Sequence, residues 1–511
     1  MKILFVDNFI LNFGVSYLSA ILKEKGHQVE LKTFIFSKSA DASIYTHPEK
    51  YFDFQEIAKG ILGRQPDLVA FSVWSPNFQF YKQLAATLRS LGGPPMLVGG
   101  VLPTLRPDLF VPDTACDLLF RGEAEPVIEA LVQGLVSGHY QQLPNVVYRG
   151  SEGQMIQTPM RSYLDNLDTL PIRDHLLYPN HSHALYVITS RGCAMKCSYC
   201  SAGSNSRMVV QDNARLVRKR SVESVITEIK SVLKEGPFRE IFFYDDFFIN
   251  NFKWISEFLA AYRQEIGLPF YCLAFPATVT PAIARELAVS GCQGVLMGFQ
   301  TANAEYKSRV LSRPEPTARV LRAIECLRAE GVRCSLDHIF NLPGETHEDI
   351  RLSLDFYIDN KVDSLMIFFL NYFPDSAITS YALQQGILCQ EHYERIMRNE
   401  MVGEQSYRGT IIDAAKSDEQ VRFAVLFRLI PLLPGKLVKY LFHKKWYRYF
   451  PTGRAFYYMI SGLAVARGMG LRSLLNTLYL AFGLKGMKPR DMLLKRLKKT
   501  GDLVSGSPPG V

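Results

Sequence analysis

The sequence lacks most of the features that mark membrane, secreted and disordered proteins. Its first residues, Met1 to Asp7, are apolar but too short for a secretory signal peptide, and no small-residue cleavage site follows them. No low-complexity segment is present, and only residues 505–511 have the composition of a loose end. With 48% apolar and 21% charged residues, the chain has ordinary globular composition, and we expect it to be cytoplasmic.

The nine cysteines lack the paired pattern of a disulfide framework. Several, such as Cys272, Cys292 and Cys326, stand alone in segments with strand or helix character, which fits buried reduced thiols. Three others stand close together and need an explanation of their own.

At 511 residues the chain exceeds the usual size of one domain, so we expect two or three. No internal repeat is evident. Over residues 1–145, short apolar runs alternate with helical patterns, which predicts an α/β domain with a doubly wound, Rossmann-like sheet. The expected strands are 3–7, 29–34, 68–73, 96–99 and 117–121, and the expected helices are 15–25, 53–62 and 77–91. Residues 146–184 contain hairpin-like pieces but no long periodic segment, and are expected to form a linker.

Strands and helices alternate again over residues 185–384. The expected strands are 185–189, 240–244, 271–274, 294–299, 333–340 and 364–370, and the expected helices are 221–234, 281–290, 318–330 and 347–359. Six such units predict a partial (β/α)6 barrel of the TIM type, with its chemistry at the C-terminal ends of the strands. From residue 385 to 511 strand signals vanish, which predicts a helical, basic C-terminal domain.

Cys193, Cys197 and Cys200 directly follow the first strand of the predicted barrel. Three thiolates at this spacing can hold three irons of a [4Fe–4S] cluster and leave the fourth iron open to a small molecule. The alternatives are a zinc site, a reactive thiol or chance. Structural zinc usually takes four ligands in paired spacing, and no second His or Cys pair follows nearby. We therefore interpret the three cysteines as ligands of a catalytic cluster.

This spacing, with Tyr199 before the third cysteine, resembles the radical S-adenosylmethionine (SAM) superfamily over about residues 185–375. The resemblance implies that the open iron binds SAM and that one electron, from a reductant such as flavodoxin or ferredoxin, yields a 5′-deoxyadenosyl radical. It also implies that the SAM adenine lies near Tyr199, and its amino group near Tyr244, Asp245 and Asp246. The acidic pair could instead cap the next helix.

Two further positions match the family less closely. Gln300 stands where the family usually has Glu, so it can hydrogen-bond a ribose hydroxyl but carries no charge. Arg313 matches the arginine that approaches the SAM carboxylate, and Arg309 is an almost equal candidate by spacing. Arg218 to Arg220 precede a helix with Ser221 as a candidate N-cap, which favours a structural role.

The N-terminal domain carries loops suited to a ligand, because a doubly wound sheet binds ligands beyond the carboxyl ends of its strands. Paired glycines there allow a ligand close approach, although they can also form an ordinary tight turn. In this context residues 1–140 resemble the cobalamin-binding domain of one large subgroup of radical SAM enzymes. That resemblance implies a cobalamin site that includes Ser72, Trp74, Asn77, Gly99, Gly100 and Glu123.

The domain has no Asp-x-His-x-x-Gly motif, by which some cobalamin proteins supply a histidine to cobalt. His27, at the predicted end of a helix, is expected on the surface. We therefore expect the lower face of a bound cobalamin to lack a histidine ligand.

The subgroup's commonest reaction, methylation of an unactivated carbon with SAM and cobalamin, is what the resemblance implies here. One alternative is a cobalamin-assisted radical cyclase or ring rearrangement without methyl transfer, as in tetrapyrrole synthesis. Another, from a different class, is a cobalamin or redox sensor that binds partners through its basic tail.

Residues 431–500 hold fifteen Lys or Arg and one acid, Asp491. This surplus suits a solvated helical face, nucleic acid, an anionic lipid surface or an acidic substrate. The apolar segment 455–484 is interrupted by Arg467 and Arg472, which argues against a spanning helix, and residues 494–499 end in a cationic run. Core helices with snorkelling arginines are the alternative to a helix at the membrane interface. We expect no nucleic-acid partner and a small-molecule substrate, which peripheral membrane contact would make lipophilic.

Overall fold

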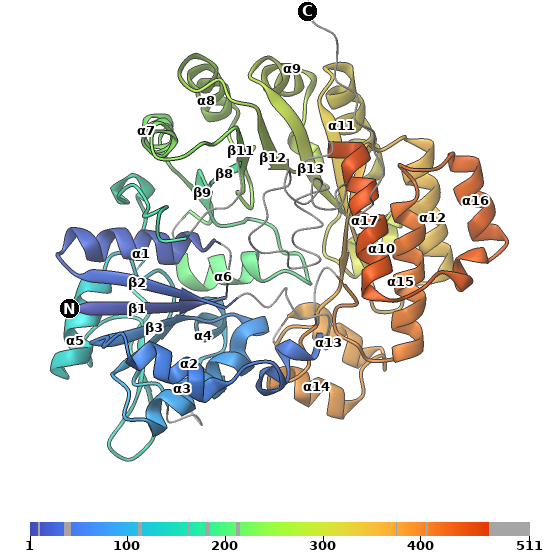
Figure 1. The fold of residues 1–511 in the computed structure, drawn as a ribbon. Coiled ribbons are helices and arrows are strands. Elements are labelled where there is room, and N and C mark those ends of the chain that lie inside the picture. The colour runs from blue at the N-terminus through green and yellow to red at the C-terminus, as the bar shows by residue number, and fades with distance from the viewer. Residues whose placement is uncertain are drawn as a thin grey trace, which may run out of the picture.

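The computed structural model of the protein describes residues 1–8, 11–34, 42–110, 115–161, 163–178, 184–210, 215–374, 376–403 and 407–469. Three neighbouring parts are visible in Figure 1: an N-terminal sheet with its helices (blue), a larger sheet with its helices (green to yellow), and a group of C-terminal helices (orange to red). Helix α6 (Ser201–Val210) contacts α4 (Val101–Leu105) of the N-terminal part. The fold is therefore α/β, with helices added at its C-terminal end, as the sequence predicts.

The N-terminal sheet has seven strands in the order β2-β1-β3-β4-β5-β6-β7. Its parallel strands are β1 (Lys2–Asp7), β2 (Gln28–Thr33), β3 (Leu68–Ser72), β4 (Met96–Gly99) and β5 (Leu118–Phe120). The main covering helices are α1 (Phe13–Glu24), α2 (Phe54–Leu62), α3 (Phe78–Ser90) and α5 (Ile128–Ser137). All eight predicted elements are present, with ends that differ by at most two residues.

Burial on both faces explains why the first strand is almost continuously apolar. Ile3 and Phe5 belong to the core on one face of the sheet, and Leu4 and Val6 belong to the core on the other. A strand covered by helices on both sides has no solvated face, so its sequence does not alternate.

The first part of the predicted linker extends this sheet. Strands β6 (Val146–Arg149) and β7 (Met155–Gln157) form an antiparallel hairpin that pairs with β5. Strands this short leave little periodic signal in the sequence, and the long-range pairing with β5 cannot be read from it. The N-terminal sheet thus continues past the boundary predicted at residue 145.

The second sheet is an open, partial barrel of six parallel strands in the order β15-β14-β13-β12-β11-β8. The strands are β8 (Ala184–Val187), β11 (Glu240–Phe243), β12 (Phe270–Ala274), β13 (Cys292–Gln300), β14 (Arg333–Phe340) and β15 (Ser364–Phe369). The crossover helices are α7 (Val222–Leu233), α8 (Phe252–Glu265), α9 (Pro281–Val289), α11 (Thr317–Ala329) and α12 (His347–Asp359). All predicted strands and helices of this region are present within two residues of their expected ends.

The two faces of these strands differ in burial. The outward-facing side chains of Val187, Phe243 and Cys272 are almost fully buried under the helices. The intervening residues point to the inside of the barrel, where Phe242 stacks on Tyr186 with ring centroids 5.7 Å apart and on Tyr271 with centroids 5.4 Å apart. The inner face is therefore lined with aromatic rings.

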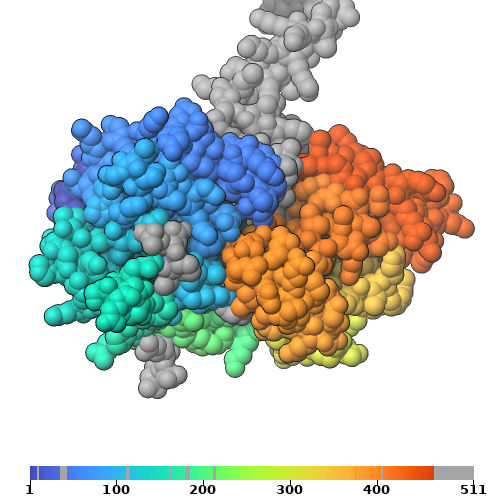
Figure 2. All heavy atoms as spheres, turned by 90° about the horizontal axis from the view of Figure 1, so that it is seen from below, coloured from blue at the N-terminus to red at the C-terminus, as the bar shows by residue number. Residues whose placement is uncertain are grey.

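The C-terminal helices include α13 (Ala377–Gln384), α14 (Gln390–Met397), α15 (Ala414–Arg428), α16 (Gly435–His443) and α17 (Arg454–Met469). They form a lobe beside the barrel in Figure 2, and α15 and α17 pack on β15. Arg472, Asp491, residues 494–499 and the side chain of Arg467 lie outside the described residues. Among the helices that are described, none combines the length and apolarity required to cross a bilayer.

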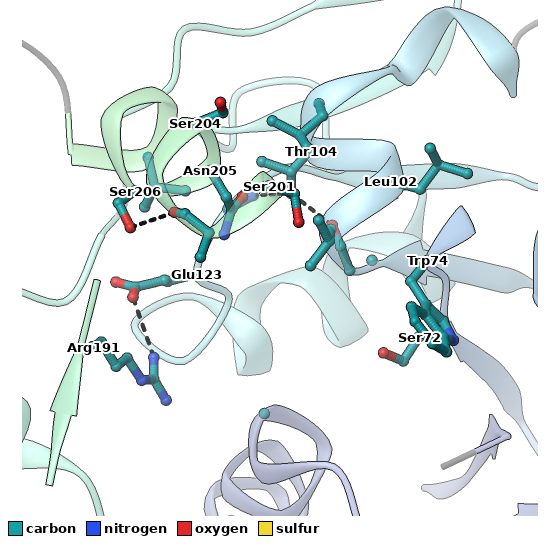
Figure 3. Close-up of a pocket in the computed structure, with 18 of the residues that line it drawn as sticks. Ser72, Trp74, Leu102, Thr104, Glu123, Arg191, Ser201, Ser204, Asn205 and Ser206 are labelled. Carbon is teal, nitrogen blue, oxygen red and sulfur yellow. Dashed lines mark hydrogen bonds and ion pairs between the residues drawn. The ribbon is translucent and has the colours of Figure 1, made fainter. Parts of the chain in front are cut away.

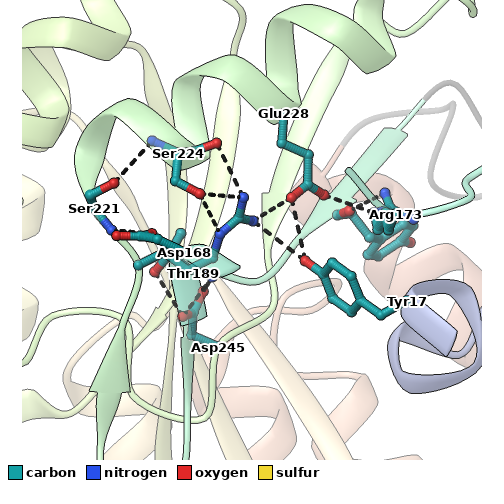
Figure 4. Close-up of polar contacts among 10 residues, drawn as sticks. Tyr17, Asp168, Arg173, Thr189, Ser221, Ser224, Glu228 and Asp245 are labelled. Atoms are coloured by element: carbon teal, nitrogen blue, oxygen red, sulfur yellow. Dashed lines mark hydrogen bonds and ion pairs between the residues drawn. The ribbon is translucent and has the colours of Figure 1, made fainter. Parts of the chain in front are cut away.

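A buried ionic network joins the two sheet domains (Figure 4). Glu228 of α7, whose side chain is 2% exposed, accepts a hydrogen bond from Arg173 Nε at 3.1 Å and another from Arg220. The hydroxyl of Tyr17, on α1 of the N-terminal domain, donates to the same carboxylate at 3.3 Å. Burial, followed by the charge of Glu228, raises the pKa of Tyr17, so its hydroxyl stays protonated as a donor. The network ties α1 to the barrel.

We predict that Glu228→Ala destabilises the protein by about 3–5 kcal/mol, because it leaves two guanidinium groups buried without their carboxylate. The measurement is the free energy of unfolding in urea. Glu257→Ala is the matched control, because the Glu257 side chain is 56% exposed and lies 4.0 Å from Lys253. Equal losses of stability in the two variants would contradict the structural role of Glu228.

Candidate active site

The three cysteines lie on the loop between β9 (Ser190–Arg191) and α6, beyond the end of the first barrel strand. Gly192 opens this loop with φ of +95°, and a Cβ on it would lie 1.8 Å from the carbonyl oxygen of Leu216. Only glycine fits there. The next amide, of Cys193, donates to Ser206 Oγ on α6 at 3.1 Å, so the loop is held from both sides.

The thiols fit a set of cluster ligands. All three are free: Cys193 is buried, Cys197 is half-buried and Cys200 is exposed. Burial is the largest cause that raises the pKa of the Cys193 and Cys197 thiols. Iron binding would favour deprotonation of these thiols, because the thiolate is the form that binds the metal. No group of His, Cys, Asp or Glu within the described ranges converges on a single metal ion, but a four-iron cluster needs none, because each thiolate binds a different iron.

Arg313 lies against the cysteine loop, whereas Arg309 does not. Arg313 is 5% exposed and donates to the Tyr199 hydroxyl at 3.4 Å and to the Gly298 carbonyl oxygen at 3.1 Å. Arg309 instead donates to Tyr381 at 3.2 Å. Of the two arginines that spacing could not separate, Arg313 is thus the one beside Tyr199.

Gln300 offers an unused acceptor. It ends β13 with φ of +64° and is 4% exposed. Its Oε1 has no hydrogen-bond partner among the residues that the structure describes. Buried acceptors are rarely left unpaired in proteins, so this amide is suited to a ligand hydroxyl.

Asp245 anchors the cysteine loop and does not line the cavity described below. Its carboxylate accepts from the Thr189 amide at 3.0 Å, the Thr189 hydroxyl at 2.8 Å and the Ser190 hydroxyl at 2.5 Å. The alternative role of this acidic pair as a helix cap is wrong, because Asn251 caps α8. Asp246 does line the cavity, and burial, followed by the charge of Asp245, raises the pKa of Asp246.

A cavity of about 1810 Å³ lies between the two sheets and is reached by loops of both (Figure 3). From the N-terminal domain it is lined by Ser72, Trp74, Gly99, Gly100 and Glu123, and from the barrel by Cys197, Cys200, Tyr244 and Asp246. The predicted residues outside this lining are Asn77, Cys193, Tyr199, Asp245, Gln300 and Arg313. No histidine lines the described part of the cavity.

The two glycines after β4 play different roles. Gly100 has φ of +117°, and a Cβ there would lie 2.4 Å from the Val73 carbonyl oxygen, so the turn requires glycine. A Cβ on Gly99 would have the Phe120 carbonyl oxygen as its nearest neighbour, at 4.0 Å. Gly99 therefore leaves space beside the cavity that a larger side chain would occupy.

The loop after β3 is held by amide side chains. Asn77 is 5% exposed, and its Oδ1 accepts from the Trp74 amide at 2.8 Å. The Trp74 indole donates to Asn8 at 3.1 Å, and the Ser72 hydroxyl accepts from Asn12 at 3.0 Å. Asn77 thus supports Trp74 from behind, while Trp74 and Ser72 face the cavity.

His27 does not lie free on the surface as expected. Its side chain is 8% exposed, and its Nε2 lies 2.9 Å from Glu129 Oε2. That expectation is wrong because α5, which follows far later in the sequence, packs against α1 and covers the histidine.

Glu123 links the N-terminal domain to the strands beside the cysteines. Its carboxylate accepts from Arg218 at 2.7 and 2.9 Å and from Arg191 at 3.4 Å. Burial acts to raise the pKa of Glu123, but the two guanidinium groups outweigh it and hold the pKa below its usual value. Arg191 also donates to Glu125 at 2.6 Å. The sequence did not predict this role of Arg191. The signal for it was the position of Arg191 immediately before Gly192 and the cysteines.

We predict that Asp245→Ala reduces the iron content of anaerobically reconstituted protein severalfold, because Thr189 and Ser190 lose the acceptor that holds the start of the cysteine loop. Asp246→Ala is the matched neighbour and should load iron like the wild type. Iron and sulfide analysis measures the effect. Equal iron contents in the two variants would remove the anchoring role.

We predict that Gly99→Leu abolishes retention of cobalamin but leaves iron loading intact, since the new side chain fills the space beside β4. Cys197→Ala should show the converse pattern, with cobalamin retained and cluster absorbance lost. Absorbance spectra of both proteins after reconstitution and desalting give the comparison. Loss of both groups in either variant would show that the two sites do not load independently.

Comparisons with known proteins agree with the two-part site. The Radical SAM superfamily profile matches residues 187–357, and the B12 binding domain profile matches residues 5–132. The chain is 24% identical over 392 residues to an uncharacterized methyltransferase of Pyrococcus horikoshii, covering 75% of this chain and 80% of that protein. It is 22% identical over 431 residues to the cytidylyl-2-hydroxyethylphosphonate methyltransferase of Streptomyces wedmorensis, covering 74% and 79%.

The fold resembles a solved structure over almost its whole length. The radical SAM methyltransferase TsrM from Kitasatospora setae, solved with cobalamin and a [4Fe–4S] cluster, superimposes with a TM-score of 0.64 over 94% of this chain and 99% of that one, at 15% identity. The two matched domains line one cavity, and the three free cysteines belong to the barrel domain, two of them on the cavity wall. The chain is therefore a cobalamin-dependent radical SAM enzyme, whose cofactors are a [4Fe–4S] cluster, SAM and cobalamin.

Proposed function

We propose that the enzyme transfers a methyl group from SAM to an unactivated carbon of a small-molecule substrate. The observation that carries this proposal is the shared cavity, with Cys197 and Cys200 on one side and Ser72, Gly99 and Gly100 on the other. When bound, the cluster with SAM supplies a radical that removes a substrate hydrogen, and cobalamin carries the methyl group. A substrate between them would be within reach of both.

The relatives support methyl transfer over other radical reactions. Two proteins that align with about three quarters of this chain are named methyltransferases. Radical cyclisation or ring rearrangement would use the cysteine side of the cavity but would not require a methyl donor on the opposite side.

The chain's own residues would position SAM. In our proposal Arg313, held by Tyr199 and the Gly298 carbonyl oxygen, attracts the SAM carboxylate. The free Oε1 of Gln300 accepts a ribose hydroxyl, and Asp246 at the cavity wall receives the amino group. Asp245 acts indirectly, by holding the loop that carries the cysteines.

The N-terminal loops would position cobalamin. We propose that the nucleotide tail passes Ser72 and Gly99, where the backbone leaves space, and that Trp74 lies under the corrin. Because no described cavity residue is a histidine, the lower face of the cobalt would lack a histidine ligand.

We further propose that the enzyme acts in the cytoplasm and receives electrons from a flavodoxin or ferredoxin. The substrate would be a small molecule that fits beside both cofactors in the cavity.

The test is anaerobic turnover of reconstituted protein with trideuteromethyl SAM, a strong reductant and a small-molecule extract. We expect both 5′-deoxyadenosine and S-adenosylhomocysteine to form, and one extract component to gain the mass of a trideuteromethyl group. Cys197→Ala should abolish deoxyadenosine formation. Mass spectrometry of the reaction mixture measures all three products.

Other outcomes separate the alternatives. Deoxyadenosine without S-adenosylhomocysteine or label transfer would contradict methylation and favour the cyclase. Absence of deoxyadenosine from protein that holds its cluster and cobalamin would contradict an enzyme of either kind and favour the sensor.

A further inference from the structure

Helix α16 and the short turn that follows it, η8 (Trp446–Tyr449), are firmly attached to the C-terminal lobe by one face. Val438 is fully buried, and the Phe442 ring stacks on Tyr447 with centroids 5.8 Å apart. Tyr447 in turn packs on Phe423 of α15, with centroids 4.6 Å apart. These contacts fix which side chains of 436–449 point away from the protein.

The outward face carries large apolar side chains. Leu437 is 42% exposed, Tyr440 47%, Trp446 53% and Tyr449 87%. The rings of Tyr440 and Trp446 meet edge to face with centroids 6.0 Å apart. Single exposed apolar residues are common on protein surfaces, but a group from one short segment marks an interaction site.

The same face is positively charged. Lys436, Lys444, Lys445 and Arg448 are exposed, and no carboxylate in the described part of the chain lies within ion-pair distance of them. The sequence contains no Asp or Glu from residue 420 to 490. Lys439 differs, because it pairs with Asp355 at 3.1 Å and Asp359 at 2.8 Å. We call the exposed side chains of residues 436–449 the basic aromatic patch.

We propose that the basic aromatic patch docks the enzyme on the surface of an anionic lipid bilayer. Trp and Tyr rings favour the boundary between headgroups and acyl chains, where their apolar bodies and polar tips both find partners. Lysine and arginine side chains around them are attracted by anionic headgroups. The patch therefore matches a bilayer in both polarity and charge.

The patch suits a bilayer better than duplex nucleic acid. Phosphates would satisfy the cations but would leave Leu437 and the paired rings of Tyr440 and Trp446 beside a polar backbone. A bilayer buries these apolar groups and pairs the cations at once.

The position of the patch leaves the cavity free. In Figure 1, α16 lies at the outer edge of the C-terminal lobe, beyond α12 and α15, while α6, which follows the cysteine loop, lies between the N-terminal sheet and the barrel. If the enzyme methylates a small molecule as proposed above, docking would favour a lipophilic substrate. That consequence rests on the proposed function, whereas docking itself does not.

The experiment is flotation of the full-length, cofactor-reconstituted protein with lipid vesicles. We expect it to float with vesicles that contain phosphatidylglycerol and to be released from them by high salt. With vesicles of pure phosphatidylcholine it should remain in the bottom fraction. Removing one patch cation should weaken binding about fivefold, so Lys444→Gln with Lys445→Gln should weaken it on the order of 30-fold. Trp446→Ser with Tyr449→Ser should weaken it about tenfold or more through lost apolar burial.

The matched control changes an exposed aromatic and an exposed lysine elsewhere. Phe252 is 54% exposed and the Lys253 side chain 86% exposed, both at the start of α8. Phe252→Ser with Lys253→Gln should float like the wild type. Because every substituted side chain is exposed, all variants should keep the unfolding midpoint of the wild type, which a thermal scan checks.

Three results would overturn the proposal. They are failure of the wild type to float with anionic vesicles, flotation of both patch variants at the wild-type level, and binding to a DNA duplex as tight as to vesicles with no effect of the aromatic substitutions. Deoxyadenosine and S-adenosylhomocysteine formation in vesicle-free buffer, measured on the same samples, reports separately on the proposed function.

Discussion

Buried pairing of charges between the two sheet domains is the constraint on which the site depends. Glu228 of the barrel forms almost fully buried ion pairs with Arg173 and Arg220, and Tyr17 of the N-terminal domain donates a hydrogen bond to the same carboxylate. Glu123 receives Arg218 and Arg191 closer to the cysteines. The ion pairs of Glu123 cross from one domain to the other, and a buried guanidinium without its carboxylate costs several kcal/mol, so separation of the domains at this contact is opposed. The cavity between the domains exists because these contacts hold its two walls at a set distance.

Each wall of the cavity uses the same property of parallel sheets. The strands of a parallel sheet end at one edge, and the loops there are free to vary while the strands are not. On the N-terminal side, Gly100 turns the chain where any Cβ would strike the Val73 carbonyl oxygen. On the barrel side, Gly192 turns the chain where any Cβ would strike the Leu216 carbonyl oxygen. Asp245 accepts three hydrogen bonds from the preceding residues Thr189 and Ser190. In each of the two loops a glycine permits the tight turn, and buried polar contacts hold the neighbouring residues in place.

This arrangement explains how one chain can combine two cofactors. Radical chemistry requires that the reactive species meet only the intended partner, so the two groups must share an enclosed space. The cysteine loop and the loops after β3 and β4 meet that requirement only when the domains are joined. The C-terminal helices complete the barrel on its open side, where α15 and α17 pack on β15, and they carry the basic aromatic patch outward.

The sequence by itself determined the architecture and the kind of chemistry. Apolar periodicity located the parallel strands of both sheets to within two residues, because a strand covered on both faces must be apolar throughout. The spacing of Cys193, Cys197 and Cys200 indicated a cluster, because ligands on one short loop are close in space as well as in sequence.

Only the tertiary structure decided how individual polar residues are used. Asp245 and Asp246 are neighbours in sequence, yet one is turned into the cysteine loop and the other to the cavity. Arg309 ends α10 and Arg313 lies in the loop just after it, yet only Arg313 lies beside Tyr199. His27 is covered by α5, where its partner Glu129 lies 102 residues further along the chain. The physical reason is that a polar side chain bonds to whichever partner the fold brings near, and such partners are distant in sequence.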